Sequence, residues 1–167
     1  MDQNKILYAI ENRCLYLNFT GKIRHTVCTS LDLLIRNSVE QDEVDKFVID
    51  LRSAIYLDST SLGLLARMAR YMKNKSDEKL IIISTNEDVN QILNSVQFGS
   101  IANIIDKWNN LPEKFSDLEL IAEQVRSSRE MIIKSHQELI QINEDNRKKF
   151  TSVIESLEKK YKRENYK

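Results

Sequence analysis

The sequence predicts an α/β fold with a mixed, mainly parallel central sheet and covering helices, followed by a long C-terminal α-helical extension. Two short apolar runs, residues 47–51 and 80–83, lack the polar alternation of a half-exposed strand, so each is expected to be a buried central strand. A segment with apolar residues at helical spacing follows each run, at 62–72 and at 89–96. Strands that alternate with helices in this way are expected to be parallel neighbours.

Two further strands and a helix are expected before these central strands. Residues 5–10 and 13–19 are apolar-rich and are separated by a short polar connection at 11–12, which predicts a β-hairpin. A helix is then predicted to begin at His25 or Thr26, where an apolar stripe with helical spacing starts. In the second strand, alternate apolar residues are expected to face the core: Leu15, Leu17 and Phe19.

A third helix and a last strand complete the predicted domain. Residues 85–88 carry capping side chains ahead of an apolar stripe, so a helix is expected to start there. Gly99 follows this helix, and we expect it to be the glycine that ends it. Residues 101–105 predict a final short strand, which gives the order strand-strand-helix-strand-helix-strand-helix-strand.

The junction between the first central strand and its helix reads Asp58-Ser59-Thr60-Ser61-Leu62-Gly63. Asp, Ser and Thr are common N-cap residues because their oxygens accept hydrogen bonds from the first free amides, so capping alone would account for them. The same helix start offers unpaired amides and the positive end of the helix dipole. Phosphorylation of a hydroxyl here would add roughly −1.5 to −2 charges to one small patch.

This motif and the order of elements resemble the STAS domain of bacterial anti-sigma-factor antagonists, over residues 1–110. In that family the motif is Asp-Ser-Ser/Thr-small-Leu-Gly, and the first hydroxyl after the Asp is phosphorylated. The resemblance implies that Ser59 is the phosphorylated residue, with Thr60 as a second candidate. It also implies a partner-binding surface made of Asp58, Ser59, Thr60, Ser61, Leu62, Gly63 and Leu64. Lys22 and Arg24 are basic where the family commonly has acidic residues, which leaves the partner's identity open.

The function implied by the resemblance is partner switching. An unphosphorylated antagonist binds an anti-sigma factor that is also a serine kinase, phosphorylation of Ser59 releases it, and a serine phosphatase resets it. Burying an unpaired phosphate in an interface costs several kcal/mol, whereas a neutral hydroxyl is readily desolvated. The alternative is a STAS scaffold or regulatory subunit of a larger complex, as in stressosome-type or lipid-transport ATPase complexes, oligomerised through the C-terminal helix.

Catalysis is the weakest of the hypotheses, and the protein is not expected to be an enzyme. Ser59 has no histidine or lysine near it in the sequence to activate it as a nucleophile. His25 is expected at the surface or in a cap, and His136 is expected to face water or a polar interface position. No metal-ligand spacing is present, and three glycines cannot build a phosphate loop, so no metal or other cofactor is expected.

The C-terminal third of the sequence lacks the strand-helix alternation of the first 110 residues. Residues 111–167 are expected to form a linker, which contains the single proline Pro112, and an amphipathic helix or helical hairpin. The apolar stripe weakens at 143–146, so both one straight helix and a hairpin remain open. We expect the stripe to pack on its own second half or on another copy of the chain rather than on the domain, which makes a homo-oligomer a candidate.

Overall composition excludes several classes of partner. A formal net charge of zero provides no global attraction to nucleic acid or to an acidic membrane. No apolar run approaches the roughly 20 residues of a membrane helix, and no signal peptide is recognisable at the start, so a cytoplasmic protein is expected. Cys14 and Cys28 are isolated within apolar segments and are expected to be buried, reduced thiols.

Overall fold

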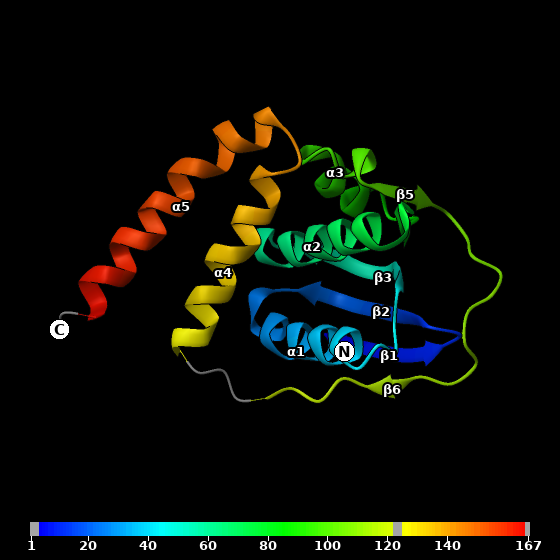
Figure 1. Cartoon of the computed structure of the whole chain (residues 1–167). Helices are drawn as coiled ribbons and strands as arrows, with labels where there is room; N and C mark the ends of the chain where they lie inside the picture. The colour runs from blue at the N-terminus through cyan, green and yellow to red at the C-terminus, as the bar shows by residue number, and fades with distance from the viewer. Residues whose placement is uncertain (1–3, 122–124, 166–167) are drawn as a thin grey trace.

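A mixed six-stranded sheet forms the centre of the computed structural model, which describes residues 4–121 and 125–165 (Figure 1). The strand order is β5-β4-β3-β2-β1-β6. Its strands are β1 (Lys5–Glu11), β2 (Cys14–Ile23), β3 (Lys46–Leu57), β4 (Leu80–Ile83), β5 (Ala102–Ile105) and β6 (Ser116–Asp117). The neighbours from β2 to β5 pair in parallel, whereas β1 pairs antiparallel with both β2 and β6. This confirms the predicted mixed, mainly parallel sheet.

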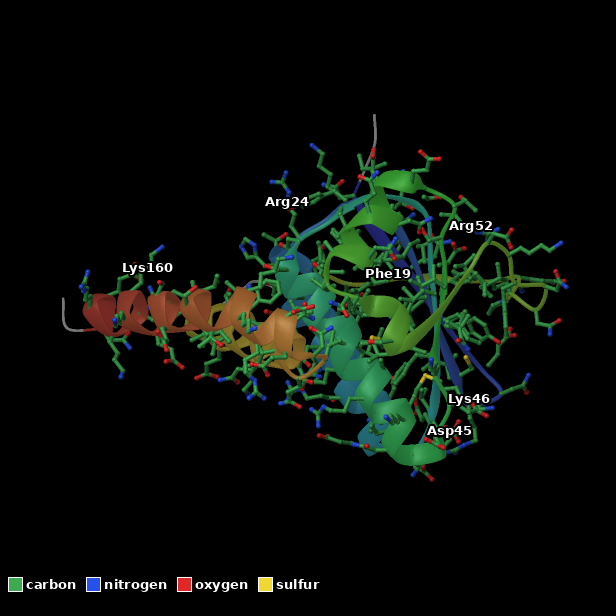
Figure 2. The ribbon with its side chains drawn as sticks, turned by 90° about the horizontal axis from the view of Figure 1, so that it is seen from above. Phe19, Arg24, Asp45, Lys46, Arg52 and Lys160 are labelled. Carbon is green, nitrogen blue, oxygen red and sulfur yellow. The ribbon has the colours of Figure 1, made fainter. Side chains whose placement is uncertain are left out.

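The helices follow the strands in the predicted order. They are α1 (Cys28–Glu40), α2 (Ser59–Ser76), α3 (Glu87–Ser95), α4 (Val125–Ile140) and α5 (Glu144–Asn165), with short 3-10 turns η1 (His25–Val27) and η2 (Phe98–Ser100). Helices α1 to α3 lie on one side of the sheet (Figure 2). The alternate residues of β2 that were expected in the core are buried there: Leu15, Leu17 and Phe19. None of the described helices is long and apolar enough to cross a membrane.

Two strands are longer than the sequence pattern predicted. β2 continues past Phe19 to Ile23 and β3 continues past Leu51 to Leu57, because the two strands go on pairing in parallel through two register shifts. Gly21 lies within this part of β2 with a φ of 80°, a conformation that glycine adopts without strain. The hairpin turn itself falls at Asn12 and Arg13, whose φ values of 51° and 62° are those of a type I′ turn.

The expected role of Gly99 is wrong. Gln97 is the residue that takes the left-handed conformation after α3, with a φ of 56°, and Gly99 lies in η2. The turn places the Phe98 side chain in the core, where it is fully buried. Burial of that ring outweighs the usual preference for glycine at a left-handed position.

The segment after β5 packs on the other side of the sheet. Trp108 and Leu111 contact a small buried cluster made of Cys14, Val48 and Ile83. The chain then adds β6 to the sheet edge and continues with a bond from the Leu118 amide to the Ile6 carbonyl, 3.0 Å. Residues predicted to be a linker therefore cover a sheet face and a sheet edge. Both cysteines are buried and neither forms a disulfide, as predicted.

Helices α4 and α5 form a structure that we call the C-terminal hairpin, with its turn at 141–143. Helix α4 packs on α2, contrary to the expectation that the extension avoids the domain, and α5 packs on α4. Met131, Leu139 and Phe150 from the hairpin join the same core cluster as the sheet. Figure 1 shows α4 crossing the start of α2, and both figures show α5 pointing away from the sheet, with Lys160 far from Phe19 in Figure 2.

Candidate functional site

Asp58 is the N-cap of α2 and joins two parts of the fold. One carboxylate oxygen accepts hydrogen bonds from the Ser61 amide and the Ser61 hydroxyl, both at 2.8 Å. The other oxygen accepts from the backbone amide of His25 at 2.6 Å. Asp58 therefore fastens the start of α2 to η1, and its side chain is only 19% exposed. The capping role expected for this residue type is present in the structure.

The predicted site residues differ sharply in exposure. Asp58 and Ser59 are partly exposed. The other five are buried: Thr60, Ser61, Leu62, Gly63 and Leu64. The Ser61 hydroxyl is also close to the Cys28 sulfur, at 3.5 Å, in the interior. Of the three hydroxyls in the motif, only that of Ser59 belongs to a residue at the protein surface.

Ser59 is in contact with a residue far away in the sequence. Its Oγ lies 2.9 Å from Nε2 of His136 on α4. The other ring nitrogen, Nδ1, lies 2.6 Å from the Ile132 carbonyl oxygen, which can only accept, so we assign the proton to Nδ1. In the neutral tautomer with its proton on Nδ1, Nε2 is an acceptor and the Ser59 hydroxyl donates to it. His136 is 5% exposed, so it does not face water but takes the polar interface position that was the other expectation. It brings to Ser59 a histidine that is distant in the sequence.

A backbone-to-backbone contact allows α4 to come this close. A Cβ atom added to Gly63 would lie 2.0 Å from the Ser135 carbonyl oxygen and 2.4 Å from its carbonyl carbon. Any side chain at position 63 would therefore collide with the backbone of α4. Ser135 is itself 2% exposed. Gly63, which the sequence marked only as part of a motif, is a point where the backbones of α2 and α4 approach each other closely.

Further polar contacts hold the hairpin beyond this point along α4 and at its turn. Arg70 on α2 donates from Nε to Glu138 on α4 at 3.0 Å and forms a second bond through Nη2. This pairing raises the pKa of Arg70. At the hairpin turn, Asn146 is 1% exposed and donates from Nδ2 to the carbonyls of Val96 and Leu139, at 3.0 and 3.1 Å. The hairpin is thus fixed to α2 and to the end of α3.

Neither the histidines nor the cysteines belong to a metal site in the described ranges. Residues 4–121 and 125–165 contain no group of three or more His, Cys, Asp or Glu side chains that could hold a metal ion. Burial raises the pKa of Cys14 to about 11, which leaves its thiol protonated at neutral pH. The groups around Ser59 are a hydroxyl, an imidazole and a capping carboxylate.

Comparison with known proteins agrees with this architecture. The solved structure of the anti-sigma factor antagonist SpoIIAA in its unphosphorylated form is similar in fold, with a TM-score of 0.51 and 14% sequence identity. The match covers 65% of this chain and 90% of that chain. No curated protein matches the sequence. The model of the STAS domain matches residues 5–110, more than half of the 167 residues, so the chain belongs to the STAS domain family.

Proposed function

We propose that this protein is a cytoplasmic anti-sigma-factor antagonist that acts by partner switching. With Ser59 unphosphorylated it binds an anti-sigma factor that has serine kinase activity, and phosphorylation of Ser59 releases that partner until a serine phosphatase resets it. One observation carries the proposal: Ser59 is the partly exposed hydroxyl at the start of α2. Thr60 and Ser61 are each 4% exposed, which keeps them from a kinase in this conformation.

The surroundings of Ser59 suit a switch that works through charge. A phosphoryl group would add roughly −1.5 to −2 charges next to the Asp58 carboxylate. The backbone amide of Ser61, in the first turn of α2, already donates to Asp58, so it is not available to a phosphate on Ser59. An approaching acidic surface would therefore meet increased repulsion after phosphorylation.

Exposed apolar residues beside the motif support a protein-binding surface. Ile55 and Tyr56 at the end of β3 are 45% and 41% exposed. Lys22 lies opposite Tyr56 in the sheet register, so a basic group borders this pair. Aromatic and apolar residues with a charged rim are typical of protein interfaces.

The test compares two full-length baits, one with Ser59 and one with phosphoserine incorporated at position 59 during synthesis. From lysate of the native cell, the first is expected to capture a protein with a serine kinase domain, and the second to capture much less of it. The captured kinase should then phosphorylate wild type and Thr60→Ala, but not Ser59→Ala, as mapped by mass spectrometry. Equal capture by both baits, or equal phosphorylation of Ser59→Ala, would refute the proposal.

The scaffold alternative is favoured by one observation, the projection of α5 away from the domain (Figure 1). Val153 on α5 is 38% exposed and could contact another copy. If α5 is an oligomerisation device, light scattering of the full chain will give a multimer that Val153→Glu dissociates. A monomer at micromolar concentrations would remove this alternative.

The Ser59–His136 bond also raises the question of catalysis, because a serine next to a histidine is the arrangement of an activated nucleophile. The third group that would orient the histidine is here the Ile132 carbonyl rather than a carboxylate. Asp58 is already bonded to Ser61 and His25. We therefore expect a fluorophosphonate probe to leave Ser59 unmodified by intact mass, and an adduct on Ser59 would favour an enzyme.

A further inference from the structure

The C-terminal hairpin contacts the partly exposed Ser59, and we propose that docking of this hairpin and phosphorylation of Ser59 exclude each other. In the unphosphorylated protein α4 is docked on α2, and a phosphate on Ser59 keeps the C-terminal hairpin undocked from α2. The inference rests on the proposed function in taking Ser59 as the modified residue. It adds a regulatory element that lies outside residues 5–110, the part that the family model matches.

The first argument is one of space. The 2.9 Å between Ser59 Oγ and His136 Nε2 is a direct hydrogen bond, with no room for a phosphorus atom and its oxygens between them. A phosphate oxygen that hydrogen-bonded to Nε2 would itself need about 2.7–2.9 Å. Ser59 and His136 would therefore have to move apart by roughly 1–2 Å to keep the two helices in contact.

The second argument is that α4 has little freedom to make such a shift. Gly63 and Ser135 touch through their backbones one turn further along α2. Arg70 and Glu138 bond through two pairs of atoms beyond that point. Packed helices of this kind do not deform continuously, so a phosphate that prevents the Ser59–His136 contact is expected to release α4 as a unit.

The third argument concerns charge. His136 donates from Nδ1 to the Ile132 carbonyl and presents the lone pair of Nε2 toward Ser59. A phosphate at this position would face an acceptor nitrogen on one side and the Asp58 carboxylate on the other. His25 is a further titratable group near this end of α2, and its Nδ1 lies 3.6 Å from the Asp58 carboxylate. Placing a phosphate against a nitrogen lone pair and a carboxylate is costly.

Release of the hairpin would expose one stripe of α2. Residues of this stripe that contact or border α4 recur at helical intervals: Ser59, Gly63, Ala66 and Arg70. Small residues in the middle of the stripe allow another helix to approach closely. The phosphorylated and unphosphorylated proteins would therefore differ in an entire helix face, as well as in charge.

The test measures hydrogen exchange of α4 in the full chain. Phosphoserine incorporated at position 59 during synthesis is expected to speed exchange of α4 amides by about tenfold or more relative to wild type. Gly63→Ala should do the same without any phosphate. Because Ala normally favours a helix over Gly by about 1 kcal/mol, faster exchange would come from the collision with Ser135 and not from a weaker α2.

Gly99→Ala is the matched control, because a Cβ at Gly99 would meet nothing within 4 Å. Its α4 exchange should equal that of wild type, and protection of β3 in every sample shows that the domain is folded. If Gly63→Ala fails to fold, Glu138→Arg replaces it as the second variant. It places a cation opposite Arg70, so it is also expected to release α4 and to speed exchange of the α4 amides.

Unchanged α4 exchange in the phosphoserine protein, with Gly63→Ala exchanging faster, would overturn the proposal, because docking would then tolerate the phosphate. Slower exchange would overturn it too, since His136 would then be protonated and would clamp the phosphate. The phosphate is introduced without a kinase, so this outcome is independent of whether Ser59 is modified in the cell. Failure here and failure of the proposed function can therefore be told apart.

Discussion

Asp58 provides a quantitative test of how the start of α2 is built. Its carboxylate accepts three hydrogen bonds, two from Ser61 within the helix and one from the backbone of His25 in η1. Asp58→Ala removes all three acceptor contacts at once. Asp58→Asn can keep an oxygen for Ser61 but turns an amide donor toward the His25 amide, so it removes only the link between the two elements.

The expected losses follow from the kind of bond removed. Loss of an N-cap costs about 1 kcal/mol, within a range of roughly 0.5–2. A hydrogen bond to a charged group contributes about 1.5–3 kcal/mol. Asp58→Ala is therefore expected to lower the free energy of unfolding by about 2–4 kcal/mol. The loss in free energy of unfolding should be smaller for Asp58→Asn, near the contribution of the His25 hydrogen bond alone.

Urea unfolding at 25 °C, followed by circular dichroism and by the fluorescence of Trp108, measures both losses. Glu113→Ala, an exposed carboxylate removed from a loop, is the reference and should change stability by less than about 0.5 kcal/mol. If Asp58→Ala were no more destabilising than Glu113→Ala, the three bonds would contribute nothing net. The conclusion that Asp58 stabilises the contact between η1 and the start of α2 would then be wrong.

Two further predictions concern buried groups. Because burial raises the pKa of Cys14 to about 11, its thiol stays protonated at pH 8 in the folded protein. Iodoacetamide should then modify Cys14 only after urea is added or as the pH rises toward 11, as followed by mass spectrometry. Asn146→Ala leaves the buried carbonyls of Val96 and Leu139 without this donor, and should cost about 1–3 kcal/mol in urea unfolding. A loss below about 0.5 kcal/mol would show that the hairpin turn is not held there.

The domain could be predicted from the sequence because its signals are local. The runs at 47–51 and 80–83 are apolar except for Asp50 and lack polar alternation, which indicates a covered sheet, and the helical spacing after each run defines the crossovers. Strand ends were less well predicted, since the extensions of β2 and β3 depend on pairing between segments that lie far apart. The turn at Gln97 was missed because burial of Phe98, a tertiary effect, decides it.

The site could be predicted only in part. The motif identified Ser59 and the cap Asp58, but helical spacing shows that α4 has an apolar face without showing which surface covers that face. The Ser59–His136 contact joins residues 77 positions apart. One local signal was available: a glycine inside a helix costs about 1 kcal/mol relative to Ala, so Gly63 within an otherwise regular helical pattern indicates close packing against another element.

The contact with His136 also changes how a substitution at the proposed phosphorylation site must be interpreted. Ser59→Ala prevents phosphorylation, but it also leaves Nε2 of His136 buried without the hydroxyl that donates to it. An unsatisfied buried acceptor costs about 1–3 kcal/mol. We therefore expect α4 amides to exchange faster in Ser59→Ala than in wild type, even though no charge has been added.

A second substitution separates the two effects of Ser59→Ala. Replacing both partners of a buried hydrogen bond by apolar groups is often nearly neutral, so Ser59→Ala combined with His136→Leu should restore slow exchange of α4. This double variant would be closed and unable to accept a phosphate, whereas Ser59→Ala alone would be partly open. Wild-type exchange in Ser59→Ala alone would show that the hydroxyl does not help to hold the hairpin, and that only the bulk and charge of a phosphate could release it.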